Sequence, residues 1–157
     1  MNCLKTYALS VGKADEERLN IQCRICDPYT KRFRSENLPS LVGKTVLDIG
    51  CGTGVLSCYW AEEVGPTGKV IAIDISNEQL DIARKQSAEL ALHNIEFIEM
   101  NVENINSLHE KFDLIYCRFV LMHLKDQEEI LKKMYAQIKS GGYLFCEEAM
   151  SYDAFFF

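Results

Sequence analysis

The sequence predicts an α/β fold with a doubly wound parallel sheet, and three observations support this prediction. Beyond about residue 44, short β-branched or aromatic runs alternate with segments whose apolar residues recur every three or four positions. One apolar run, residues 46–49, leads directly into a glycine-rich turn, and the segment before residue 44 has only helical periodicity. We therefore expect one domain over residues 1–157, with a helical N-terminal extension (1–43), an α/β core (44–149) and a tail (150–157).

The N-terminal extension is expected to form two helices. The pattern of Ala14–Cys26 is strongly helical. Asp27 and Pro28 should interrupt that helix, because proline has no backbone N–H and clashes with the preceding turn. A second, polar helix is then predicted to run to about Ser35.

Five strands are expected in the core. Each is a short run of β-branched, aromatic or other apolar residues, and all but the last lead into a helix or turn signal. The predicted strands are Thr45–Ile49, Val70–Asp74, Ile95–Met100, Phe112–Cys117 and Tyr143–Cys146.

The first core helix follows the glycine-rich turn. Leu56, Trp60 and Val64 form an apolar row spaced by four, and Gly65-Pro66 should end the helix. This row is expected to face the sheet.

The two later helices begin at capping signals. Ser76 and Gln79 have the spacing of a capping box, and Asp126 is a good N-cap for the last helix. Lys139 is placed in the final turn of that helix, and Gly141-Gly142 is expected to end it.

Composition favours an ordinary globular protein. Hydrophobic residues make up 48% and charged residues 25%, and the formal net charge is −6. No basic run is present that would neutralise a phosphate backbone, so nucleic-acid binding is not expected. No apolar stretch is long enough to cross a bilayer, so we expect no membrane partner and a cytoplasmic location.

The cysteines are expected to be reduced thiols. Seven cysteines are irregularly placed, and no second CxxC completes a zinc site. Cys23 and Cys26 form one CxxC, but together with Leu19 they are spaced four and three residues apart. This spacing favours one apolar helix face, with metal or redox chemistry as the alternative.

The most informative segment for chemistry is residues 46–54, Val-Leu-Asp-Ile-Gly-Cys-Gly-Thr-Gly. Its glycines let the backbone adopt left-handed angles, and they let a ligand lie close to the N–H groups at the start of the following helix. A nucleotide-type cofactor is the natural ligand. A tight structural turn is the alternative.

The glycine spacing helps to identify the cofactor. A dinucleotide loop has the pattern G-x-G-x-x-G, but Val55 stands where the third glycine should be and Gly54 precedes it. Asp48, two residues before the first glycine, is not part of that pattern either. A nicotinamide cofactor is therefore disfavoured.

With these motifs the sequence resembles the class I S-adenosylmethionine-dependent methyltransferases over about residues 7–148. The resemblance implies a Rossmann-like sheet of order 3-2-1-4-5 and S-adenosylmethionine as cofactor. The matching core segments are Asp48–Gly54, Ile71–Ser76, Ile98–Val102, Phe112–Arg118 and Ile138–Gly142. The segments Tyr7–Leu9, Glu16–Leu19 with Gln22, and Val120–Leu124 resemble the generic small-molecule branch.

The resemblance, together with the chemistry of the residues, assigns roles in binding the cofactor. Asp74, at the end of the second strand, should accept hydrogen bonds from the ribose hydroxyls, unless it is a turn or capping residue. Gly50 and Gly52 would face the methionyl and ribose parts of the cofactor, while Ile75 and Val102 would sandwich the adenine ring.

Asn101 occupies a position where the family often has aspartate, and its carbonyl oxygen can still accept from the adenine amino group. Arg118 could pair with the methionyl carboxylate, or it could be a plain surface arginine. Arg18 and Gln22 are weaker candidates for the same end of the cofactor.

No catalytic residue is assigned. His123 could act as a base towards the acceptor, but a partly buried structural histidine is the more usual case. Glu147 and Glu148 could contact the acceptor or form a solvated acidic edge.

The resemblance also implies a sheet of seven strands, whereas only five are expected here. We therefore expect the chain to be truncated after the fifth strand, which leaves an open apolar edge that could pair with a second copy. The aromatic tail, Phe155–Phe157, could cover this edge or bind a partner.

The leading function is methyl transfer to a small-molecule acceptor. A binding or interaction module without turnover is the alternative, because the acceptor side is expected to be incomplete. A nicotinamide-dependent enzyme with the same fold is the third hypothesis for the function.

Overall fold

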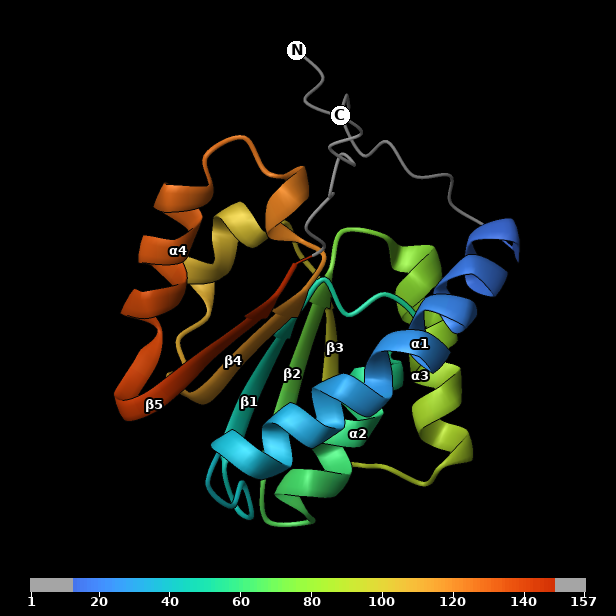
Figure 1. The fold of residues 1–157 in the computed structure, drawn as a ribbon, viewed down its shortest axis with the longest axis horizontal. Coiled ribbons are helices and arrows are strands. Elements are labelled where there is room, and N and C mark those ends of the chain that lie inside the picture. The colour runs from blue at the N-terminus through green and yellow to red at the C-terminus, as the bar shows by residue number, and fades with distance from the viewer. Residues whose placement is uncertain (1–12, 149–157) are drawn as a thin grey trace, which may run out of the picture.

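The computed structural model describes residues 13–148, with side chains from residue 21 onward. Helices and strands alternate along the chain, and two short 3₁₀ helices interrupt this order (Figure 1). The elements are α1 Lys13–Asn37, β1 Thr45–Ile49, α2 Val55–Val64, β2 Lys69–Asp74, α3 Asn77–Glu89, β3 Ile95–Glu99, η1 Val102–Ser107, β4 Phe112–Arg118, η2 Leu121–His123, α4 Gln127–Ala136 and β5 Ile138–Glu147.

The five strands form one parallel sheet in the order β3-β2-β1-β4-β5. This confirms the predicted fold class and strand order. The chain runs outward from β1 to β3 on one side and then returns to β4 on the other side of β1. Ligands of open α/β sheets bind at such a reversal, outside the carboxyl ends of the strands.

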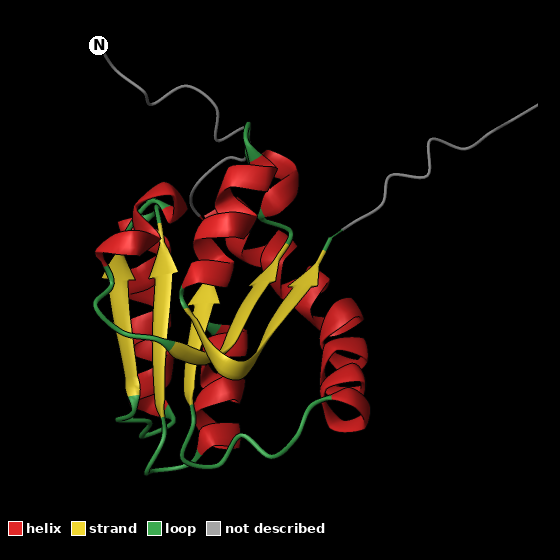
Figure 2. Ribbon diagram, turned by 90° about the vertical axis from the view of Figure 1, so that its left-hand side faces the viewer, coloured by secondary structure: helices red, strands yellow, loops and turns green. Residues whose placement is uncertain are grey.

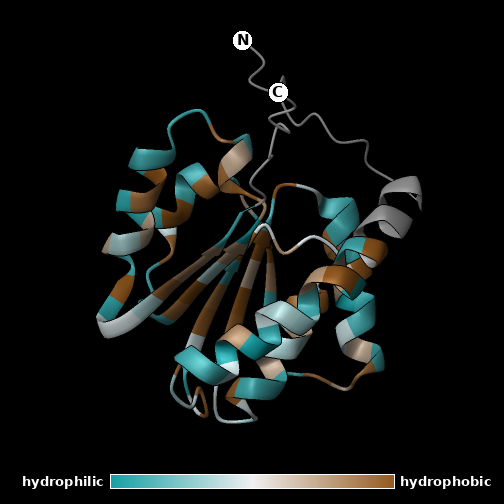
Figure 3. Cartoon of the chain, in the orientation of Figure 1, coloured by the Kyte–Doolittle hydropathy of each residue, from teal (hydrophilic) through white to brown (hydrophobic). Residues whose placement is uncertain are grey.

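Both faces of the sheet are covered, because alternate strand residues point to opposite sides. On one face, Val46, Leu114 and Tyr116 pack against Trp60 and other residues of α2. On the opposite face, residues such as Leu47 pack with η1, η2 and α4. Viewed from the side, helices flank the sheet on both faces (Figure 2). The strands are hydrophobic over most of their length (Figure 3), as expected for a sheet buried on two sides.

The first four strands were predicted to within one residue at either end. The fifth strand is longer than expected. It begins at Ile138 and not at Tyr143, since α4 already ends at Ala136. Lys139 is therefore not in the last turn of the helix and Gly141-Gly142 does not end it, because all three residues lie within β5. Here the pairing register with β4 shifts, since Phe112 pairs with Ile138 but Leu114 pairs with Tyr143.

The N-terminal segment forms one helix instead of the predicted two. Pro28 lies inside α1 and does not break it. Contacts on both sides of the proline hold the helix together. Asp27 pairs with Arg118 of β4 at 2.9 Å, and Thr30 donates to Glu147 of β5 at 2.8 Å and to the carbonyl of Cys26 at 3.3 Å.

The predicted helix caps are confirmed. Ser76 Oγ accepts from Gln79 N at 3.4 Å, and Asp126 Oδ1 accepts from Glu129 N at 3.0 Å. Within residues 13–148, no helix is long and apolar enough to cross a membrane. The tail, residues 150–157, lies outside the described part of the chain.

The close packing of α2 against α3 predicts that Gly54→Ala is strongly destabilising. A Cβ at Gly54 would lie 2.6 Å from the Cβ of Ala83, and φ at this position is +80°. Gly141→Ala is a matched control, because φ is +77° there but nothing lies within 4 Å of the added Cβ. We expect Gly54→Ala to lower the free energy of unfolding by about 1–3 kcal/mol more than Gly141→Ala does. Urea denaturation followed by the fluorescence of Trp60, the single tryptophan, measures this, and equal losses would contradict it.

Candidate functional site

The glycine-rich turn lies at the carboxyl end of β1, beside the reversal of strand order. Gly50, Gly52 and Gly54 all have left-handed φ angles, between +54° and +80°. The backbone N–H groups of Gly50 and Cys51 both donate to the carbonyl of Ile73, at 2.8 and 3.0 Å. The turn is therefore fixed against the end of β2 and lies directly before the N-terminus of α2.

Asp74 lies against this turn, as the sequence predicted. Its Oδ2 accepts from the backbone N–H of Gly52 at 2.8 Å, and its Oδ1 accepts from that of Ser76 at 2.9 Å. The residue is 6% exposed. Burial raises the pKa of this carboxyl, while the backbone N–H groups of Ser76, Gly52 and Ile75 act in the opposite direction. A carboxylate has roughly four lone-pair positions, so capacity remains to accept further hydrogen bonds.

The loop after β4 covers the other side of the turn, which the sequence analysis did not foresee. A Cβ at Gly50 would lie 2.5 Å from Cγ2 of Val120, so only glycine fits beneath that side chain. The preceding residue, Phe119, has φ of +57°, although it is not a glycine. Backbone strain of this kind tends to occur where a fold positions a functional loop.

Asp48 is a second buried carboxyl beneath the turn. It is 2% exposed, and Ser57 Oγ of α2 donates to its Oδ2 at 2.6 Å. Burial raises the pKa of Asp48 to about 6, and the hydrogen bond from Ser57 opposes this shift. The sequence motif includes Asp48 but does not predict its hydrogen bond with Ser57, because Ser57 lies nine positions further along the chain.

The residues predicted to contact adenine lie at the ends of β2 and β3. Ile75 is 47% exposed, which is unusual for isoleucine and leaves an apolar surface next to Asp74. Val102 is 8% exposed and packs into the core. Asn101 Oδ1 accepts from Glu103 N at 2.9 Å and so caps η1.

Arg118 connects the sheet to α1. Its Nη1 donates to Asp27 Oδ1 at 2.9 Å and to Thr30 Oγ1 at 3.3 Å, and its Nη2 donates to Cys23 Sγ at 3.4 Å. The side chains of the ion pair are only 10% and 14% exposed, so Arg118 is not a plain surface arginine. The sequence did not predict this pairing, because the two partners are 91 residues apart.

Glu147 extends the same network. Its carboxylate accepts from Thr30 Oγ1 at 2.8 Å and from the hydroxyl of Tyr116. Glu148 has a different role, since its Oε1 accepts from Leu121 N at 2.8 Å and from Val120 N at 3.1 Å. Both glutamates are thus engaged within the chain, and neither is a free acidic edge.

Three weaker candidates are less informative. His123 lies exposed in η2 and not partly buried as expected, whereas Gln22 of α1 is half-buried. The side chain of Arg18 lies outside the described part of the chain. Within residues 21–148, no group of three or more metal-ligating side chains is suited to hold a metal ion.

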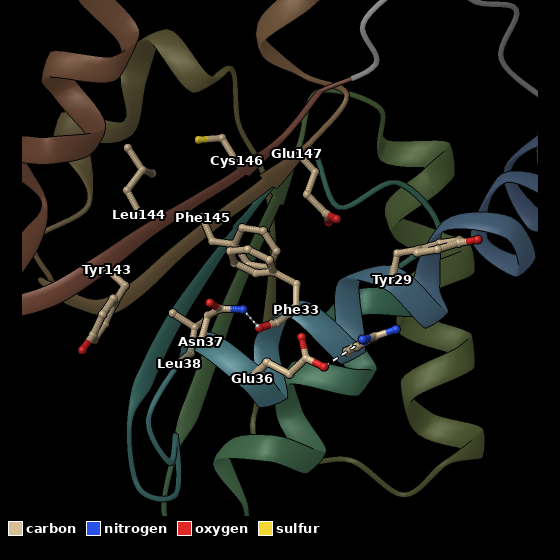
Figure 4. A pocket seen from close by; sticks show the side chains of 11 residues that line it. Tyr29, Phe33, Glu36, Asn37, Leu38, Tyr143, Leu144, Phe145, Cys146 and Glu147 are labelled. Carbon is tan, nitrogen blue, oxygen red and sulfur yellow. Dashed lines mark hydrogen bonds and ion pairs between the residues drawn. The ribbon is translucent and has the colours of Figure 1, made fainter.

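A surface groove of about 830 Å³ lies away from the glycine turn, between α1 and β5 (Figure 4). Phe33 stacks on Phe145 within it, with ring centroids 4.7 Å apart. Tyr29 and Tyr143 lie at its margins and are 72% and 41% exposed. The groove runs beside the strand that forms one edge of the sheet.

Comparisons with known proteins agree with this geometry. Residues 41–155 match a family described as "Methyltransferase domain". The chain is 38% identical over 104 residues to a demethylmenaquinone methyltransferase of Listeria monocytogenes, with 66% of this chain and 44% of that protein covered. It is 34% identical to a Lactococcus lactis protein of the same name, with 90% and 62% covered.

Solved structures show the same fold. A SAM-dependent methyltransferase from Aquifex aeolicus aligns with a TM-score of 0.68 and 25% identity, over 86% of this chain and 71% of that one. PKMT2 from Rickettsia typhi, solved in complex with AdoHcy, aligns with a TM-score of 0.63 and 28% identity, over 69% and 21%. The chain spans about half the length of the curated relatives it matches.

Buried Asp48 predicts a distinctive pH dependence of stability. Its pKa of about 6 lies above the ordinary value of 3.8, so the folded protein holds the proton more tightly than the unfolded chain does. The contribution to stability is full below about pH 4 and is lost as pH rises through about 6, a loss of roughly 3 kcal/mol. In Asp48→Asn this loss should vanish, which urea denaturation at several pH values would measure.

The matched control for this prediction is Asp81→Asn on α3, where the side chain is 69% exposed. It should keep the pH dependence of the wild type. If the stability of Asp48→Asn fell with pH as steeply as that of the wild type, the assignment of this loss to Asp48 would be wrong.

Proposed function

The chain belongs to the methyltransferase-domain family that its residues 41–155 match, and we propose that it binds S-adenosylmethionine and transfers the methyl group to a small-molecule acceptor. The observation that carries the proposal is the contact between Asp74 and the glycine turn, where the carboxylate lies 2.8 Å from Gly52 N. A ligand held by the turn would therefore meet this carboxylate directly.

The residues present fit the nucleoside part of the cofactor. Asp74 retains acceptor capacity for the two ribose hydroxyls, and bonds from hydroxyls to an ionised carboxylate are strong. The exposed side chain of Ile75 offers an apolar face for adenine. On this proposal, Val102 lies on the opposite side of the ring, and Asn101 accepts from the adenine amino group while still capping η1.

The methionyl part is assigned to Gly50, Gly52 and Arg118. The turn would contribute backbone atoms, although Val120 already occupies the space where a side chain at Gly50 would lie. Arg118 has five N–H donors, so it can serve a carboxylate while Asp27 holds its guanidinium in place. Its burial between α1 and the sheet would make such an interaction less screened by water.

The cofactor supplies a methyl group already activated by a positive sulfonium, so the protein's main task is to align donor and acceptor and to exclude water. Alignment of this kind contributes roughly 7–11 kcal/mol in favourable cases. A base is needed only if the acceptor loses a proton on attack. None of the described residues is assigned that role, since Glu147 and Glu148 are both engaged within the chain.

The similar proteins from Listeria and Lactococcus are named demethylmenaquinone methyltransferases. A quinone-type small molecule is therefore the first acceptor to test. Detection of labelled methyl transfer to it would support turnover by this chain. The second candidate function is a binding module without turnover. It is supported by the internal hydrogen bonds of Glu147 and Glu148, which leave neither glutamate assigned as a base. Cofactor binding without methyl transfer to any member of an acceptor panel would favour this second function.

The first test concerns Asp74. We expect Asp74→Ala to weaken binding of S-adenosylhomocysteine by about 100-fold or more, because two hydrogen bonds to a charged group are lost. Isothermal titration calorimetry measures the affinity, and thermal melting confirms that the variant folds. Asp81→Ala on the exposed surface of α3 is the matched control and should bind like the wild type. Undetectable binding by the folded wild-type protein would overturn the proposal.

We also propose that the free edge of β5 joins a second copy of the chain. Among the described strands β5 pairs only with β4, so its outer backbone groups are free for another strand. A two-fold axis would pair the same edge from both copies. The groove lies beside this edge and exposes Phe33, Tyr29 and Tyr143, next to the ion pair of Arg32 and Glu36.

The association predicts a dimer in sedimentation analysis. Tyr143→Glu should shift the protein to monomer, because it places a charge in the apolar surface that two copies would bury. Tyr135→Glu is the matched control, since this tyrosine is 76% exposed on α4 and lies outside the groove. A wild-type protein that stays monomeric at high concentration would contradict the assignment.

A further inference from the structure

Two cysteines face each other across neighbouring strands, close to the proposed site. Cys117 of β4 and Cys146 of β5 are register partners in the parallel sheet. Cys117 Sγ donates to Cys146 Sγ, and the two sulfur atoms are 3.3 Å apart. Both side chains lie on the face of the sheet that η1, η2 and α4 cover.

The two thiols differ in their access to solvent. Cys117 is fully buried, with 0% exposure, whereas Cys146 is half-buried near the open edge. The hydrogen bond from Cys117 lowers the pKa of Cys146, and the same bond together with burial raises the pKa of Cys117. The accessible thiol is thus the one that ionises more readily, and the thiolate is the reactive form of cysteine.

We propose that Cys117 and Cys146 form a redox couple, which a peroxide oxidises to a disulfide between β4 and β5. The Cys146 thiolate attacks the peroxide and its O–O bond breaks. This gives a sulfenic acid on Cys146 and, after protonation of the leaving hydroxide, one water. The Cys117 thiol then attacks the Cys146 sulfur, the S–O bond breaks, and its hydroxyl leaves with the Cys117 proton as a second water. Both sulfurs are oxidised together by two electrons, and the peroxide is reduced.

The geometry permits this bond with little movement. A disulfide has an S–S length of about 2.0 Å, so the sulfurs must approach by about 1.3 Å from their present 3.3 Å. Neighbouring strands are about 4.8 Å apart, which lies within the range of Cα separations that disulfides span. Cys23 and Cys26 differ from this pair, because Cys23 Sγ accepts a hydrogen bond from Arg118.

The crosslink would fix the most weakly held strand of the sheet. β5 pairs only with β4 among the described strands, so a covalent link to β4 restrains its detachment. Each cysteine also immediately precedes a residue that anchors α1, namely Arg118 on β4 and Glu147 on β5. Oxidation therefore stabilises the edge on which α1 is anchored, whether or not the chain transfers methyl groups.

The test is oxidation of the whole wild-type chain with limiting hydrogen peroxide, followed by alkylation and peptide mapping without reductant. We expect a dithiothreitol-sensitive link between Cys117 and Cys146, and at least about tenfold slower hydrogen exchange of the amides in residues 138–147. Cys58→Ser is the matched control. It removes a buried thiol of α2 and should leave both results unchanged.

Cys146→Ser should abolish both the link and the slower exchange, and Cys117→Ala should leave Cys146 as a trappable sulfenic acid. The mapping of the wild type gives a result even if these variants fold poorly. Oxidation that first joins Cys23 to Cys26, or that converts Cys146 to sulfinic acid while Cys117 stays reduced, would overturn the proposal.

Discussion

The site depends on one buried carboxylate that joins two separate segments of the backbone. Asp74 accepts from Gly52 N in the turn after β1 and from Ser76 N at the start of α3. Burying a carboxylate is costly, and the two N–H groups offset part of that cost. The same bonds fix the left-handed turn against β2. The side chain that fixes the shape of the turn is therefore also the one to which our proposal assigns the ribose.

A second polar assembly holds α1 in place. α1 carries exposed apolar residues, Ile21, Ile25 and Tyr29, on one side. Hydrophobic burial alone therefore does not fix its position. The ion pair between Asp27 and Arg118 adds specificity, because a buried charge left without its partner is strongly destabilising. The same network places α1 beside the carboxyl ends of β4 and β5.

Much of the fold could be predicted, because the central strands β1, β2 and β4 are mostly apolar and two of the helices between strands have local caps. Ser76 and Asp126 show this, since their partners lie three residues away. Predictions were wrong where distant contacts outweigh local preference. Pro28 should end a helix, yet Arg118 and Glu147 hold the turns on either side of it. Gly141-Gly142 looks like a helix stop, but it lies within β5, between Ile138 and Tyr143, which both pair with β4.

The site was predictable to the extent that its chemistry is local. The glycine turn and Asp74 follow from a short motif and its spacing, whereas three long-range features required coordinates. These are the pairing of Arg118 with Asp27, the contact of Val120 with Gly50, and the bond from Ser57 to Asp48. Nothing in the local sequence marks two residues 91 positions apart as partners.

The two acids beneath the turn also give the site an electrostatic character. With a pKa of about 6, Asp48 is mostly ionised at neutral pH even though it is 2% exposed. Burial is the main cause of the raised pKa of Asp48, the hydrogen bond from Ser57 and the charge of Arg118 oppose it, and the charge of Asp74 adds the smallest contribution. The ionisation of Asp48 thus depends mainly on its burial beneath the turn and on the two partners that oppose the effect of burial, Ser57 and Arg118.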